Sequence, residues 1–149
     1  MTRKPYQQGR IFIGRLPKGA DLVQSITRIA NEEEIKAGTV VVHGMVSRLS
    51  LSNFDLATGT NRMIEREEMM EIASGGGTIS QFKGRSMARL NGTFATVEGN
   101  VTGGTIALGT IVHACEVVIT EVIGGTLSRD FDPASGLPLW KESSLLLEG

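Results

Sequence analysis

Cysteine is nearly absent from this chain, since Cys115 is the only one in 149 residues. A single cysteine excludes an internal disulfide framework, so a reducing compartment is the expected environment. The first segment, MTRKPYQQGR, contains no apolar core of the length found in signal peptides. No stretch reaches the roughly 18 consecutive apolar residues of a membrane-spanning helix. We therefore expect a cytoplasmic protein without a membrane partner.

The chain also lacks an excess of charge of either sign. Its 15 lysine and arginine residues against 16 aspartate and glutamate residues give a formal net charge of -1, with a pI near 6.1. Such a balance provides no overall attraction to nucleic acid or to an anionic membrane surface. The one modest basic group is N-terminal and comprises Arg3, Lys4 and Arg10. These three residues are therefore the candidate DNA contacts.

Proline is scarce and glycine is abundant, with 4 and 19 residues respectively. Together with many threonines and valines, this composition favours strands and turns over a bundle of helices. One amphipathic stretch is the exception, because Asp21 can cap a helix that continues to about Glu34. Its apolar residues recur with the spacing of one buried helix face; they are Leu22, Ile26, Ile29 and Ala30. We expect this to be the only long helix.

Alternating apolar and polar residues predict strands along most of the remaining chain. The first such segment is GRIFIGRLP, with a strand at residues 10–16. Further strand-like runs, separated by short glycine-bearing turns, are VVVHGMV, LSLSNFD, MEIASGGGTIS, SMARLNGTFATV and GTIALGTIVHACEVVITEVI. The tail from Arg129 onward carries paired turn signals and is expected to be irregular. The predicted class is α+β: an antiparallel-rich sheet of about six or seven strands packed with one main helix.

The strand predicted from Thr110 to Ile123 is apolar on both faces, which bears on assembly. One face carries Ile111, His113, Cys115, Val117 and Ile119, and the other carries Val112, Ala114, Glu116, Val118 and Val122. A strand of this kind is typically buried on both sides. One helix of about four turns cannot cover both faces of the sheet. A second subunit is the simplest cover, so we expect an oligomer.

Five segments occur in an order that resembles one known family. They are GRIFIGRLPKGADLVQSI, IKAGTVVVHGMVSRLSL, MEIASGGGTIS, VTGGTIALGTIVHACEVVITEV and RDFDPASGLPLW. Together they are similar to the PPC domain (plants and prokaryotes conserved, also written PCC), with the domain at residues 10–140, an extension at 1–9 and a tail at 141–149. The resemblance implies an α/β homotrimer in which an antiparallel sheet packs against a helix. It also implies the family's predicted DNA binding, which comes from plant relatives joined to an AT-hook peptide built on Arg-Gly-Arg-Pro. This sequence contains no such peptide.

Many prokaryotic members of that family carry a His-x-His pair in the strand before a double glycine and a third histidine directly after it. Such a set suits a divalent metal such as zinc. The corresponding positions here, counted from Gly103 and Gly104, are Arg89, Asn91 and Thr105. Arginine keeps its proton in proteins and cannot ligate a metal, and asparagine and threonine are weak neutral donors. We therefore expect the metal site to be lost and no cofactor to be bound.

Glycine pairs beside a hydroxyl residue can also cradle a phosphate. A phosphate loop leads into the first turn of a helix, whereas the residues after VTGGT and ASGGGTIS have strand character. We expect instead a strand, a turn at residues 98–100 and a returning strand. Gly103 and Gly104 then mark a bulge or a close backbone approach.

Four further residues carry groups that could do chemistry. Glu116 lies among apolar neighbours, so its carboxylate needs a charged or hydrogen-bonding partner. Arg89 is the candidate partner if the sheet brings the two together. A structural ion pair is favoured over a catalytic acid. His43 is expected to be a hydrogen-bonded core or interface residue, and the same holds for His113. Cys115 is expected to be a small buried hydrophobe.

Two functional hypotheses follow. In the first, the chain is a non-enzymatic homotrimeric module with a DNA-binding or regulatory role, and its basic N-terminal residues give weak, non-specific contacts to DNA. In the second, a pocket between subunits binds an anionic small molecule or acts on it. The candidate pocket residues are Arg89, Asn91, Thr105, Glu116 and His43. A trimeric scaffold with a vestigial site is the third and simplest alternative.

Overall fold

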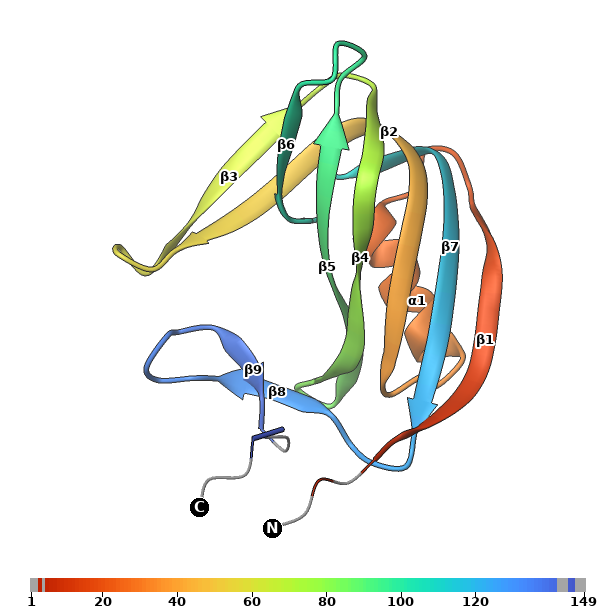
Figure 1. Cartoon of the computed structure of the whole chain (residues 1–149), viewed down its shortest axis with the longest axis vertical. Helices are drawn as coiled ribbons and strands as arrows, with labels where there is room; N and C mark the ends of the chain where they lie inside the picture. Colours follow the sequence, from red (N-terminus) through yellow and green to blue (C-terminus); the bar gives the residue numbers. More distant parts are fainter. Residues whose placement is uncertain (1–2, 4, 142–144, 147–149) are drawn as a thin grey trace.

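The computed structural model of the chain describes residues 3, 5–141 and 145–146 (Figure 1). Within them, the elements follow one another as β1 (Gln7–Leu16), α1 (Leu22–Glu32), β2 (Gly38–Asp55), β3 (Thr60–Arg66), β4 (Met70–Phe82), β5 (Arg85–Ala95), β6 (Val101–Thr105), β7 (Ile111–Ile123), β8 (Ser128–Phe131) and β9 (Pro138–Trp140). The described part of the chain is thus mostly strand, with one helix near its start, which agrees with an α+β fold.

Helix α1 forms where the sequence predicts it. The carboxylate of Asp21 accepts a hydrogen bond from the backbone amide of Gln24 at 2.9 Å, which satisfies a free amide of the first turn. The predicted apolar stripe packs against the sheet, with Ile29 half-buried and the other three fully buried: Leu22, Ile26 and Ala30. In the described part of the chain, no helix is long and apolar enough to cross a membrane.

The strands form one hydrogen-bonded assembly of nine, which is larger than the six or seven predicted. Six of them run side by side in the order β1-β7-β2-β4-β5-β6, each antiparallel to its neighbours (Figure 1). β3 pairs with β2, β8 runs parallel to β4, and β9 pairs with β8. The prediction of an irregular tail was wrong, because residues 128–131 and 138–140 form strands too short to show an alternating pattern.

Helix α1 covers one face of the six-stranded sheet, which we call the helix face. On β7 the predicted alternation holds from Cys115 onward, since Cys115, Val117 and Ile119 all lie in the core. Shifts in the pairing of β2 with β7, between Met45 and Arg48, interrupt the alternation further upstream. The core under α1 is completed by residues of the central strands, among them Val40, Val42, Ile79, Ala88 and Leu90.

The opposite face carries no helix, and we call it the helix-free face. Residues that sit opposite one another in antiparallel strands share a face, so the pairing register defines rows of side chains across it. One row is Ile13–Val118–Val41–Gly76–Asn91–Thr105, and the next is Ile11–Thr120–Thr39–Thr78–Arg89. Ile13 is 77% exposed and Val41 is 45% exposed. The apolar half of this face is therefore uncovered in the single chain.

The double glycine of β6 lies under a side chain from β2. The Oδ1 atom of Asn53 accepts the amide of Thr105 at 3.1 Å, and its Nδ2 donates to the carbonyl of Gly103 at 3.2 Å. Gly104 has a φ angle of 151°, and a Cβ atom there would overlap the Asn53 side chain. The predicted close approach at Gly103 and Gly104 is confirmed. The predicted turn is also confirmed, since β5 ends at 95 and β6 begins at 101.

Leu90 offers a test of this packing, because its neighbours Arg89 and Asn91 face the other side of the sheet. Leu90→Ala should lower the free energy of unfolding by about 2–5 kcal/mol, since it removes buried methyl groups and leaves a cavity. The matched control is Leu108→Ala, because Leu108 is 66% exposed and its truncation should change stability by less than about 0.5 kcal/mol. Chemical denaturation measures both variants, and equal losses would contradict the inward orientation of Leu90.

Candidate functional site

The sheet brings Arg89, Asn91 and Thr105 together on the helix-free face. Arg89 and Asn91 are alternate residues of β5, and Asn91 pairs with Thr105 of β6. On the other side of β5, Arg89 pairs with Thr78 of β4. The amide of Thr105 is already bonded to Asn53. The three positions thus form a compact polar group at one end of the two rows.

An open depression of about 470 Å³ lies beside this group. It is lined by small residues and one asparagine, namely Ser74, Gly75, Gly76, Asn91, Gly92, Thr93 and Gly104. The hydroxyl groups of Ser74 and Thr93 are hydrogen-bonded to each other at 2.8 Å. The glycines belong to strands β4, β5 and β6 rather than to a loop before a helix. The depression is therefore a shallow sheet surface and has no phosphate loop.

Sequence reasoning missed a second guanidinium, that of Arg129, beside Arg89. Arg129 lies in β8, which pairs in parallel with the end of β4, and its Nη2 donates to the Thr78 hydroxyl at 3.1 Å. Burial, and after it the positive charge of Arg89, lower the pKa of Arg129. The two arginines are therefore neighbours of like charge. The only signal in the sequence was an arginine in a tail that showed no periodic pattern.

Glu116 and His43 lie elsewhere on the helix-free face. Glu116 of β7 stands opposite Arg15 of β1 on one side and His43 of β2 on the other. β2 and β4 separate it from Arg89, which lies in β5. The expected pairing of Glu116 with Arg89 is therefore not formed within the chain, since strand order rather than sequence distance decides which side chains meet. Both Glu116 and His43 are exposed.

Cys115 and His113 offer no reactive arrangement in the structure. Cys115 is buried, its thiol donates to the Met45 carbonyl at 3.4 Å, and burial raises its pKa. His113 lines an open surface hollow together with Lys18. Within residues 3, 5–141 and 145–146, no three histidine, cysteine, aspartate or glutamate side chains gather into a metal-binding group. Arg89, Asn91 and Thr105 likewise do not fit a metal, because none of them is an imidazole, thiolate or carboxylate.

The N-terminal basic group is only partly accessible. Lys4 lies outside the described residues, and the Arg3 guanidinium donates to the carbonyl of Leu145. Arg10 donates from Nε and Nη2 to the two carboxylate oxygens of Glu121, at 3.0 and 2.9 Å. A second carboxylate, that of Glu33, lies 3.6 Å from Arg10. The charge of Arg10 is thus already offset within the fold, which reduces what it can offer to a DNA phosphate.

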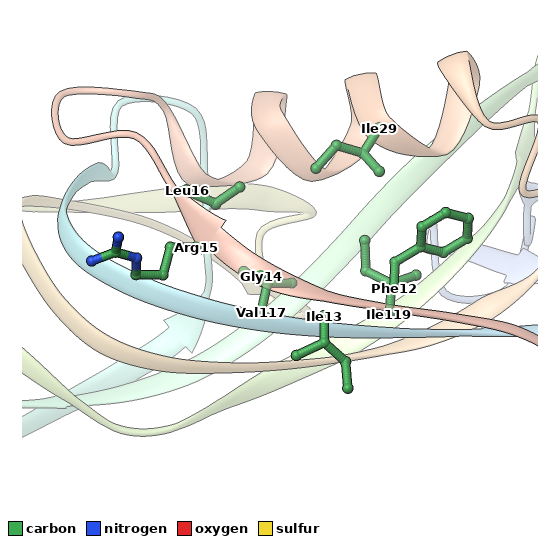
Figure 2. A pocket seen from close by; sticks show the side chains of 8 residues that line it. All are labelled: Phe12, Ile13, Gly14, Arg15, Leu16, Ile29, Val117 and Ile119. Atoms are coloured by element: carbon green, nitrogen blue, oxygen red, sulfur yellow. The ribbon is translucent and has the colours of Figure 1, made fainter.

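An apolar hollow of about 210 Å³ lies between β1 and α1 (Figure 2). Figure 2 shows Phe12 and Leu16 on the side of Ile29 from the helix, whereas Ile13 points to the opposite side of the strand. The one charged residue that lines it, Arg15, lies apart from these apolar side chains. The hollow lacks the converging polar groups of a catalytic site.

The chain is similar in sequence to a protein family and to known proteins. The family model of the Plants and Prokaryotes Conserved (PCC) domain matches residues 3–123. The chain is also similar to the Bifunctional protein GlmU of two Synechococcus strains, with 27% identity over 128 residues and 29% over 130 residues. These matches cover 85% of this chain in each case, but 20% and 19% of the relatives. The chain therefore spans about a fifth of the length of these curated relatives.

Three solved structures share the fold. A metal-containing protein from Archaeoglobus fulgidus is 29% identical, with a TM-score of 0.88 over 95% of this chain and 100% of that one. A PPC protein from Pyrococcus horikoshii is 23% identical, with a TM-score of 0.90 over 97% and 100%. A Bacteroides thetaiotaomicron protein, provisionally described as DNA-binding, is 22% identical, with a TM-score of 0.81 over 91% and 96%. The last two likenesses establish the fold alone.

The ion pair of Arg10 with Glu121 predicts a dependence of stability on pH. Hydrogen bonds from Arg10 lower the pKa of Glu121 from 4.5 to about 2. A lowered folded-state pKa contributes stability that is present above the unfolded pKa and is lost as the pH falls through the folded one. Glu121→Gln should therefore lower the unfolding midpoint at neutral pH, and the gap from the parent protein should close between about pH 4.5 and pH 2.

Thermal unfolding followed by circular dichroism across this pH range measures the effect. Glu98→Gln is the matched control, because Glu98 lies in the exposed turn between β5 and β6 and should leave the midpoint unchanged. A Glu121→Gln gap that stays constant down to about pH 2 would show that the carboxylate charge does not stabilise the fold.

Proposed function

Because the chain belongs to the Plants and Prokaryotes Conserved (PCC) domain family, we propose that it is a non-enzymatic, homotrimeric regulatory module that binds an anionic ligand beside Arg89. The observation that carries the proposal is Arg89 itself. Arg89 is half-buried, and no carboxylate among the described residues lies within ion-pair distance of it. A half-buried cation without a counter-ion favours binding of an anion from solution.

The proposed assembly follows from the uncovered half of the helix-free face. Ile13, Val118 and Val41 stand in one row across β1, β7 and β2. Ile11 and Met45 are exposed on the same strands. Contiguous apolar surface of this kind marks contact sites between proteins. Asn91 and Thr105 continue the row of Val41, so a subunit seated on the apolar half would border the candidate pocket.

The proposed ligand chemistry follows from the residues at the family's metal position. A guanidinium keeps positive charge there without Lewis-acid capacity, and an amide and a hydroxyl add neutral hydrogen-bonding groups. The Archaeoglobus fulgidus relative is described as metal-containing. We assign no catalytic residue here, because none of the described titratable groups lies in the depression beside Arg89. Binding is the activity that this composition supports.

DNA is the second candidate ligand, favoured by the provisional description of the Bacteroides thetaiotaomicron protein. Any contact would rest on phosphate rather than on bases. The sequence has no AT-hook, and the one helix among the described residues, α1, is packed on the sheet and cannot enter a groove. Arg10 is engaged by Glu121 and Glu33. Arg3, with Lys4, would therefore have to supply most of the attraction.

Assembly can be tested on the helix-free face. Light scattering should give a mass about three times the 15.9 kDa of one chain. Val41→Asp should dissociate this trimer, because it places a charge in the apolar row. The matched control is Val97→Asp, since Val97 is 98% exposed in the turn between β5 and β6 and should leave the mass unchanged. A parent protein with the mass of one chain at micromolar concentration would refute the trimer.

DNA binding can be tested by fluorescence anisotropy on unrelated duplexes over a salt series. We expect binding to be weak, insensitive to sequence and steeply weakened by salt, because only phosphate contacts are available. Replacing both Arg3 and Lys4 by alanine should abolish it and leaves strand β1, with its Arg10–Glu121 pair, intact. Tight binding to one duplex that survives this change and high salt would reveal a specific surface. The absence of binding at low salt would exclude DNA as the ligand.

A further inference from the structure

The β8–β9 hairpin adds a second cation to the proposed site, and we infer that Arg89 and Arg129 together bind a phosphate-type dianion over Thr78. The inference rests on the proposed anion-binding function and specifies the class of its ligand. It differs from the sequence expectation, in which Arg89 was the only arginine of the candidate pocket. The hairpin lies beside the end of β4 in Figure 1.

Thr78 is the residue that both arginines share. It stands opposite Arg89 in the pairing of β4 with β5, and its hydroxyl oxygen accepts a hydrogen bond from Nη2 of Arg129 at 3.1 Å. All three side chains are half-buried, so they are partly shielded from water without being closed off. Because the Thr78 oxygen acts as acceptor toward Arg129, its own proton is available to donate to a ligand.

Arg129 is held in place before any ligand arrives. Its Nε donates to the buried Ser80 hydroxyl at 3.1 Å, and its Nη1 donates to the Pro138 carbonyl at 2.9 Å. Its guanidinium also stacks 4.9 Å from the centre of the Trp140 ring. These bonds and the one to Thr78 use three of the five guanidinium N–H groups. Two donors remain, and a fixed donor loses little entropy on binding.

The charges at this place match a dianion. Neither arginine forms an ion pair with a carboxylate in the described part of the chain. The positive charge of Arg89 repels that of Arg129. A phosphate group carries about -1.5 to -2 charge at neutral pH and three acceptor oxygens. A carboxylate offsets one charge, and so does a DNA phosphodiester. Free phosphate or a phosphate monoester is therefore the better match to two guanidiniums and a hydroxyl.

Trp140 supplies the measurement, because it is the only tryptophan in the chain and lies on Arg129. Titration of the full chain with inorganic phosphate, at ionic strength held constant with chloride, should give a saturable change in tryptophan fluorescence. Arg89→Ala should weaken phosphate binding about tenfold or more, since it removes charge-assisted hydrogen bonds. Thr78→Val should weaken it less and leave the hairpin folded. Arg85→Ala, at the start of the same strand, is the matched control and should bind like the parent.

The outcomes separate this inference from the proposed function. A signal without saturation, or an equal loss in Arg85→Ala and Arg89→Ala, would mean that phosphate only screens the surface and would overturn the inference. Acetate binding as tightly as phosphate would overturn the dianion while leaving an anion site at Arg89. If neither phosphate nor acetate binds, the inference and the proposed function are both overturned. Displacement of phosphate by a short duplex at equal phosphate concentration would assign the site to DNA and overturn the small-dianion ligand.

Discussion

The structure depends on one constraint: a sheet has two faces, and the described part of the chain has one helix to cover them. Helix α1 buries its apolar stripe on the helix face and builds the core there. The other face keeps a row of apolar residues at β1, β7 and β2 and a polar group at β4, β5 and β6. Assembly and ligand binding are therefore proposed on the same surface, because the helix leaves it open.

The arginines show how the same side chain takes different roles in one fold. Arg10 is matched by Glu121 and Glu33, and it ties β1 to β7 and to the end of α1. Arg129 is matched by neutral acceptors and an aromatic ring, which fix its geometry and leave its charge uncompensated. A paired guanidinium contributes to structure, whereas a fixed guanidinium without an ion pair is available to bind an anion. Arg89 and Arg129 are the candidate anion-binding residues because of their partners, and not because of the number of basic residues in the chain.

The spacing of apolar residues along the sequence correctly predicted helix α1 and the two faces of strand β5. The stripe from Leu22 to Ala30 and the cap at Asp21 defined α1, and the alternation of β5 put Arg89 and Asn91 on one face. Strand order has no local signature, so the distance between Glu116 and Arg89 could not be deduced from sequence. The β8–β9 hairpin was missed for a similar reason: its strands of four and three residues are too short for a period to appear. Arg129 was missed with it.

Arg89, Asn91 and Thr105 set the chemistry of the helix-free face without being part of the core. These residues point away from the core, while their neighbours Leu90 and Ile106 point into it and carry the packing. A substitution on the outward side of a strand alters charge and hydrogen bonding and costs the core nothing. The double glycine beside them is constrained in a different way, since Asn53 occupies the space that a side chain at 104 would need. The scaffold thus fixes the shape of this surface, and the outward residues of β4, β5, β6 and β8 set its charge and its hydrogen-bonding groups.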